Sequence, residues 1–151
     1  MDKNNSIGEV VAIYIQDRKG KPYRPIPQGI FEKDKGLLGD IHSTGGSRQV
    51  SIFSTEGREE ILSLNTKGLC AKKFHENIRV KNLDISNLTI GSKIFIGETI
   101  QEITEIGKRC FPECNIVKEG KTCALSTQVI FTKVVKGGKI KTGDILQRVR
   151  S

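Results

Sequence analysis

The sequence predicts a mainly β fold, a closed or partly closed β-barrel with one or two short helices. Two observations predict it. β-branched residues concentrate in short segments separated by glycine-rich turns, and these segments do not alternate with helices as they do in βαβ folds. Closure into a barrel removes the exposed edges that such strands would leave. The 151 residues contain no repeat or linker, so we expect a single domain over 1–151.

The first half of the chain contains three predicted strands. Residues 8–15 (GEVVAIYI) form the first, and three prolines in the following segment, 16–29, restrict it to a loop or an edge strand. The second strand is the apolar segment QVSIF at 49–53. The third is FHENIRV at 74–80, where side chains alternate between two faces.

One helix and two pairs of strands complete the prediction. The segment STEGREEILSLN (54–65) predicts a short helix capped by Ser54 or Thr55. Residues 92–106 predict two strands joined at a Gly-Glu pair. Residues 127–149 predict a hairpin of two strands about a Gly-Gly turn.

The charge balance favours an anionic partner. The chain carries 25 Lys and Arg against 17 Asp and Glu, a net charge of +8. It has no long basic block, no Trp and only two Tyr, which argues against nucleic acid. No apolar run approaches the ~20 residues that span a bilayer, and the N-terminus lacks the layout of a signal peptide. We therefore expect a cytoplasmic protein with an anionic small molecule, and no membrane, as its partner.

A glycine-rich stretch, GLLGDIHSTGGSR (36–48), places Asp40, His42 and Arg48 close together in sequence. Glycines allow close approach of the backbone to a ligand. In an extended segment Asp40 and His42 point to the same side, so the carboxylate can orient the imidazole. Arg48 offers a planar fork for a phosphate. The alternative is a tight turn in which Asp40 caps backbone groups and His42 lies on the surface.

A second polar cluster, His75-Glu76-Asn77, lies in the third strand. The period of two puts Glu76 on the apolar face, where a carboxylate is costly unless it is paired. We expect Glu76 to pair with a partner such as Arg48 or to hold the backbone of a neighbouring loop. His75 is expected on the exposed face.

Cys110 and Cys114 are the strongest candidates for chemistry. A cytoplasmic location favours reduced thiols, and a proline between these two cysteines indicates a loop. Lys108 and Arg109 are adjacent, and positive neighbours lower a thiol pKa and favour the reactive thiolate.

Two other uses of the cysteines have weaker support. Cys110 and Cys114, with Cys123 and a histidine, match a zinc site only in part, since the second pair lacks the usual spacing. A thioredoxin-like centre is disfavoured by the missing Cys-x-x-Cys and βαβ pattern. Cys70 is expected to be a buried small hydrophobe.

These segments, taken in order, resemble the MOSC family, the domains related to the C-terminal part of molybdenum cofactor sulfurases. The resemblance rests on GLLGDIHSTGGSRQVSIF, KFHENIRV and LTIGSKIFIGETIQEITEIGKRC, and it extends over about residues 8–147. The C-terminal part is similar to the compact, stand-alone bacterial members. It departs from them at 121–125, where KTCAL replaces their Gly-Asp-Cys-Val-Met-Pro stretch.

The resemblance implies a β-rich barrel that binds the molybdenum cofactor or carries sulfur, and the family is also associated with pyridoxal phosphate binding. In larger relatives one cysteine binds molybdenum, which points here to Cys114, slightly favoured, or Cys110. The pterin phosphate would contact polar and basic residues lining one cavity, here Asp40, His42, Arg48, Glu76, Asn77, Lys108 and Arg109.

Three functional hypotheses follow. The first is a molybdenum-cofactor-related protein that binds the cofactor or transfers sulfur through a cysteine thiolate, with a cysteine desulfurase or a molybdoenzyme as partner. The second is a non-catalytic carrier of the pterin phosphate. The third is a small zinc-stabilised β-domain.

Overall fold

The computed structural model describes residues 6–41, 43, 45–46, 48–57, 59, 76–107 and 129–149. The strands in this part are β1 (Ser6–Ile15), β2 (Arg24–Ile26), β3 (Gln28–Glu32), β4 (Gly36–Leu37), β5 (Val50–Ser54), β6 (Ile78–Lys81), β7 (Lys93–Ile96), β8 (Thr99–Ile106), β9 (Ile130–Lys136), β10 (Gly138–Lys141) and β11 (Ile145–Arg148). No helix within these ranges is long and apolar enough to cross a membrane.

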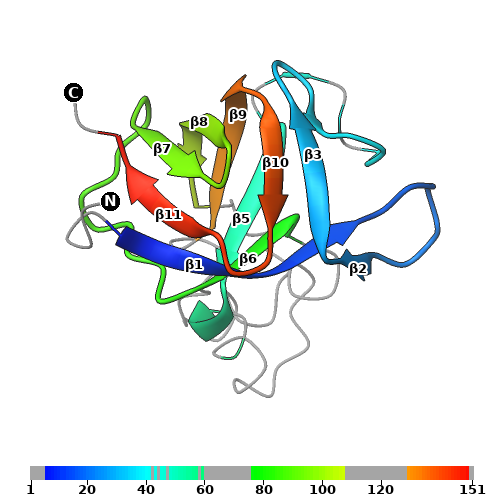
Figure 1. Cartoon of the computed structure of the whole chain (residues 1–151), viewed down its shortest axis with the longest axis horizontal. Helices are drawn as coiled ribbons and strands as arrows, with labels where there is room; N and C mark the ends of the chain where they lie inside the picture. The colour runs from blue at the N-terminus through cyan, green and yellow to red at the C-terminus, as the bar shows by residue number, and fades with distance from the viewer. Residues whose placement is uncertain are drawn as a thin grey trace, which may run out of the picture.

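Seven of the strands close into a barrel (Figure 1). Their order is β11-β7-β8-β9-β5-β6-β1, and antiparallel pairing of β1 with β11 closes the ring. β2 extends the sheet beyond β1 as a short edge strand, which confirms the prediction made from the prolines. The predicted barrel is therefore confirmed.

A row of isoleucines crosses the interior of the barrel. Ile13, Ile78, Ile52 and Ile130 are successive partners on β1, β6, β5 and β9, and each is fully buried. Burying a side chain of this size contributes about 1.5–3 kcal/mol relative to leaving it exposed. The alternation along each strand puts the neighbouring row on the outer side of the barrel, where the polar motif residues lie.

β5 and β6 form a parallel pair, so the chain between them must cross from one end of the barrel to the other. The crossover begins as the short helix expected from the sequence, since residues 55–57 and 59 are helical. The Ser54 hydroxyl accepts the Gly57 N–H at 2.8 Å, which confirms Ser54 as a cap. The sequence predicts that strands do not alternate with helices, and this strand–helix–strand connection is an exception. The apolar stripe predicted at 61–64 lies outside the described residues.

The hairpin predicted at 127–149 is wrong, whereas the β7–β8 hairpin at 92–106 is confirmed. β9 pairs with β5 and β8, while β10 pairs with β3 in a separate sheet of order β10-β3-β4. Only Gly137 separates β9 from β10, and a Cβ at Gly137 would lie 2.8 Å from the Phe31 carbonyl oxygen. The glycine therefore lets the chain pass close to β3 and change sheets.

Candidate functional site

Five residues in register form a polar band across the outer side of the barrel: Glu105, Phe131, Ser51, Asn77 and Tyr14. Phe131 is the partner of Glu105 on β8 and of Ser51 on β5. Asn77, immediately before β6, accepts the Tyr14 N–H at 2.7 Å through its backbone carbonyl. The band thus runs over β8, β9, β5, the start of β6 and β1.

Asn77 connects β5 to β1 within the polar band. Its Oδ1 accepts the Ser51 N–H at 3.2 Å, and its backbone N–H donates to the Ser51 carbonyl at 3.0 Å. Its Nδ2 donates to the Tyr14 carbonyl at 3.5 Å. The side chain is buried, so these bonds replace water and fix the band. The contact of Asn77 with a cofactor stays a prediction.

Arg48 lies over the Phe131 ring at one end of the polar band. Its Nε donates to Glu105 Oε2 and its Nη2 donates to Glu105 Oε1 at 3.3 Å. The guanidinium carbon is 4.7 Å from the Phe131 ring centroid. Glu105 and the ring hold the guanidinium in place, yet the side chain is half exposed, and these bonds use two of its five N–H groups. Arg48 therefore keeps donors for an anion.

Arg79 occupies the equivalent place at the Tyr14 end of the band. Its Nε lies 3.3 Å from Glu76 Oε2, and its guanidinium carbon lies 5.1 Å from the Tyr14 ring centroid. The prediction that Glu76 is paired with a partner such as Arg48 is confirmed for the pairing, but the partner is Arg79, three residues on, and not Arg48. Glu76 is fully buried, as predicted for this carboxylate. The predicted alternation of Glu76 and Asn77 between two faces of a strand is wrong. β6 begins only at Ile78, so both residues precede the strand, and both are buried.

Asp40 lies in a turn and not in an extended segment. Its N–H donates to the Leu37 carbonyl and its own carbonyl accepts the Ser43 N–H, both at 3.1 Å. Its Oδ1 accepts the Gln16 N–H at 2.8 Å, just beyond the end of β1. Asp40 thus caps a backbone group, as the tight-turn alternative expects. His42 lies outside the described residues, so the Asp40–His42 pairing stays a prediction.

Tyr23 faces the same carboxylate and should titrate at unusually high pH. Burial, followed by the Asp40 charge, raises the pKa of Tyr23 to about 12. We expect Asp40→Asn to lower this pKa but to leave it above the ordinary value of 10.0, because burial remains. Tyrosinate absorbance, with Tyr23→Phe to assign the signal, measures it. An unchanged titration in Asp40→Asn would remove Asp40 as a cause.

The same shift makes stability depend on pH. The pKa of Tyr23 is higher in the folded chain than in the unfolded chain, so the protonated phenol stabilises the fold below about pH 10. That contribution should be lost as the pH rises from about 10 to about 12. Urea unfolding across this range should show a smaller loss of stability in Tyr23→Phe than in the wild type.

The segment carrying the predicted thiols leaves and re-enters the barrel beside the polar band. It follows β8 and precedes β9, and its two flanking residues are joined by a 2.6 Å bond from the Gly107 N–H to the Val129 carbonyl. Cys110, Cys114, Lys108 and Arg109 lie outside the described residues, so their roles stay predictions. Among the described ranges, no three His, Cys, Asp or Glu side chains are grouped to hold a metal ion.

Comparison with known proteins decides the family. The model of the MOSC domain matches residues 39–147, most of the chain. The chain belongs to the MOSC domain family. A search of curated proteins found no match.

Solved structures share the fold of this MOSC domain. It is similar to the YuaD protein from Bacillus subtilis, at 20% identity and a TM-score of 0.70, with 95% of this chain and 97% of that chain covered. It is also similar to YiiM from Escherichia coli, at 17% identity and a TM-score of 0.62, covering 95% and 70%. YiiM from Geobacillus stearothermophilus gives 15% identity and a TM-score of 0.65, covering 95% and 75%.

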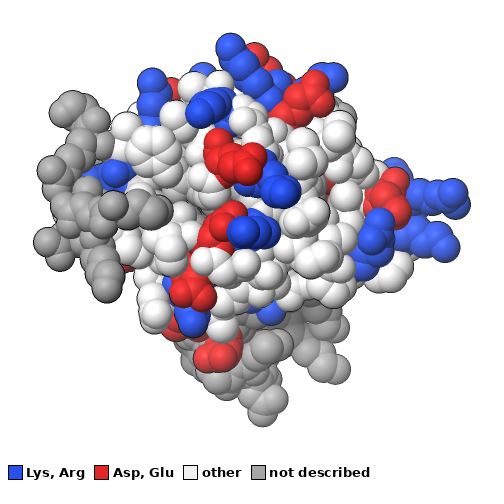
Figure 2. All heavy atoms as spheres, in the orientation of Figure 1, with Lys and Arg blue, Asp and Glu red and all other residues white. Residues whose placement is uncertain are grey.

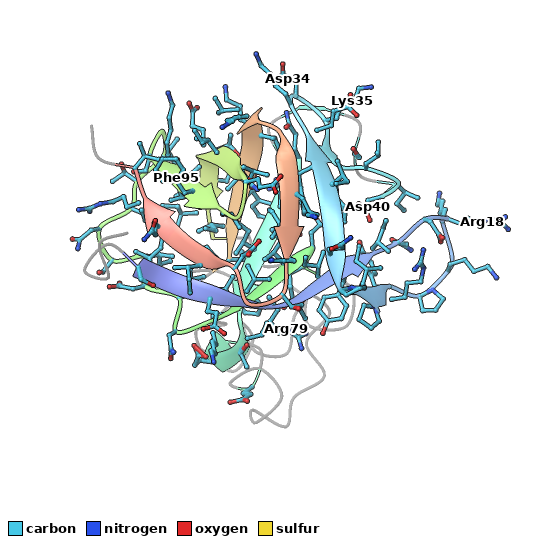
Figure 3. The ribbon with its side chains drawn as sticks, viewed as in Figure 1. Arg18, Asp34, Lys35, Asp40, Arg79 and Phe95 are labelled. Carbon is cyan, nitrogen blue, oxygen red and sulfur yellow. The ribbon has the colours of Figure 1, made fainter. Side chains whose placement is uncertain are left out.

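Sequence reasoning on this MOSC domain missed the residues that support its arginines. Tyr14, Phe131 and Glu105 read as ordinary strand residues, since stacking and pairing across strands depend on register. Arg79 carried a usable signal, because it follows the buried Glu76 by three residues. Figure 3 labels Arg79 below β1, where it is the register partner of Ala12, and Asp40 beside β3.

Proposed function

We propose that this MOSC domain binds the phosphate-bearing molybdenum cofactor along the polar band, with a thiolate of Cys114 or Cys110 as the metal ligand. The observation that carries the proposal is Arg48, a half-exposed guanidinium held over Phe131 by Glu105, next to the two ends of the segment 108–128. A charged, oriented guanidinium is the side chain best suited to a phosphate.

The described residues fit the phosphate part of the cofactor. Arg48 would donate its remaining N–H groups to phosphate oxygens, and Ser51 and Asn77 hold the strands beneath it in register. Arg79 is less exposed and is already paired with Glu76, so it would position the Tyr14 end of the band and not bind the anion directly. When bound, the cofactor would supply redox chemistry at molybdenum, and a soft thiolate suits that metal.

Cofactor binding is tested with Arg48→Met. The protein would be produced with molybdate in cells that make the cofactor, and molybdenum and pterin would be measured per protein chain. We expect Arg48→Met to lower both about tenfold, as the loss of a charged hydrogen bond worth about 1.5–3 kcal/mol predicts. Arg148→Met, an exposed arginine on β11, is the matched control and should retain both.

Two results would contradict this proposal. Equal molybdenum contents in Arg48→Met and Arg148→Met, with both variants folded by circular dichroism, would remove the polar band as the phosphate site. Stoichiometric zinc without pterin in the wild type would favour the zinc-stabilised domain instead.

Sulfur transfer is the second candidate, supported by the two basic residues that precede Cys110. The thiolate would attack the terminal sulfur of a persulfide on a cysteine desulfurase. The donor S–S bond breaks, the donor thiolate leaves, and a persulfide forms on this chain. After incubation with desulfurase and cysteine, the sulfane sulfur bound to the chain would be measured. Cys114→Ser or Cys110→Ser should lose this sulfur, whereas Cys70→Ser should keep it. Absence of sulfane sulfur on the wild type would end this candidate.

A further inference from the structure

A groove of about 510 Å³ lies away from the polar band, between the β7–β8 turn and strands β10 and β11. It is lined by Phe95, Gly97, Glu98, Lys139, Lys141, Asp144, Ile145 and Gln147. Figure 3 labels Phe95 on β7, on the opposite side of the view from Asp40. The residues that line the groove include none of the five that form the polar band, so the groove is distinct from the proposed cofactor site.

Strand addition cannot fill this groove, although β10 pairs only with β3 in its sheet. The Lys139 N–H donates to Glu98 Oε1 at 3.1 Å, and the Lys141 N–H donates to Asp144 Oδ2 at 2.9 Å. The Lys139 carbonyl accepts the Glu98 N–H at 3.1 Å. These contacts occupy the edge of β10, so any partner must bind through side chains.

The charged side chains of the groove alternate in sign. Figure 2 shows red and blue groups alternating across the middle of the face that carries β10 and β11. Within the described part of the chain, the ammonium groups of Lys139 and Lys141 form no ion pair, although both stand beside a carboxylate. A uniformly acidic or basic partner would meet repulsion here, whereas an alternating surface is complementary to itself after a two-fold rotation.

Apolar residues accompany these charges. Phe95 is 40% exposed at the groove, and Ile30 and Leu38 are 49% and 55% exposed. Ile30 is the register partner of Lys139 on β3, and its carbonyl accepts the Leu38 N–H at 2.8 Å on the side of β3 away from β10. Ile30 and Leu38 therefore continue the row of Lys139 outward from the groove. Across a two-fold axis, the apolar projection of each copy can fill the hollow of the other.

We propose that this face binds a second copy of the chain across a two-fold axis. Lys139 of each copy pairs with Glu98 of the other, and Ile30 and Leu38 of each copy enter the groove of the other beside Phe95. The dimer leaves the polar band of both copies accessible, so the proposal does not depend on the cofactor.

The test is the oligomeric state, measured by light scattering at about 100 µM protein. If the dimer dissociates with a constant of about 1 µM, this concentration is roughly a hundredfold higher and most chains are dimeric. The wild type should be a dimer. Lys139→Glu and Glu98→Lys should each weaken it at least about tenfold, because each places like charges against each other at both symmetry-related contacts. Lys19→Glu makes the same charge change in an exposed turn and should stay dimeric.

Mixing the two charge variants separates interface from folding. Lys139→Glu carries a carboxylate at both 98 and 139, and Glu98→Lys carries an ammonium at both. In an equimolar mixture every contact across the axis therefore joins opposite charges, so the heterodimer should form while neither variant dimerises alone.

A third variant removes the apolar part of the interface. Phe95→Lys, at a side chain that is 40% exposed, should also be monomeric, and its circular dichroism should match that of the wild type. A monomeric wild type, dimeric single variants or a monomeric mixture of the two charge variants would each overturn the proposal.

Discussion

Gly36→Ala should lower the free energy of unfolding by about 3 kcal/mol, one of the largest effects expected from a single methyl group in this chain. Gly36 has a φ of 120°, a conformation that disfavours L side chains. A Cβ there would also lie 2.5 Å from the Gln49 carbonyl oxygen, which belongs to the backbone and cannot rotate away. The glycine at the start of the motif thus allows the two ends of the loop 36–49 to meet.

Urea unfolding and thermal melting measure this effect. For a domain of about 150 residues, about 3 kcal/mol corresponds to a fall in Tm of about 6–12 °C. Gly20→Ala is the matched control, since Gly20 also has a positive φ of 85° but no atom lies within 4 Å of its Cβ position. It should cost only about 1 kcal/mol. Equal losses in the two variants would show that backbone conformation, and not the approach to Gln49, accounts for Gly36.

Arg79→Met should destabilise the protein by about 3 kcal/mol, the low end for breaking a buried pair, because Arg79 itself is 27% exposed. The change keeps an apolar side chain against Tyr14 but removes the charge that faces the fully buried Glu76. Removing one partner of a buried pair is costly because the remaining charge is poorly solvated. The loss of the guanidinium over the ring accounts for about 0.5–1 kcal/mol of this cost.

Arg24→Met is the control for this ion pair. Arg24 lies 3.4 Å from Asp17, with both side chains about half exposed, so its loss should cost less than about 1 kcal/mol. Chemical denaturation of both variants gives the comparison. A cost for Arg79→Met as small as that of Arg24→Met would mean that other contacts of Glu76 hold the carboxylate.

The barrel was predictable because its interior follows simple alternation. The isoleucines at 13, 52, 78 and 130 mark strands by their period and their β-branched side chains. The failure at 127–149 has a physical cause: a Gly-Gly pair favours a turn locally, but which sheet the next strand joins depends on the approach of β3. Local sequence carries no information on that contact.

The site was predictable in its residues more than in its contacts. The period of two predicted the burial of Glu76, and the cost of an unpaired carboxylate predicted that it has a partner. The capping role of Asp40 was the tight-turn alternative for the glycine-rich stretch. The Gln16 partner of Asp40 is set by the turn at Asp40 and the end of β1, which single-sequence patterns do not determine. Arg79 could have been found, because it follows Glu76 by only three residues.

The number of strands in the barrel has a consequence for the site. Around any closed ring of strands the direction of the chain must reverse an even number of times, so a seven-membered ring cannot be antiparallel throughout. The parallel contact between β5 and β6 is that obligatory exception, and it brings the chain back to the end where β5 began. The start of β6 therefore lies beside the start of β5, and ring closure itself brings Asn77 to Ser51.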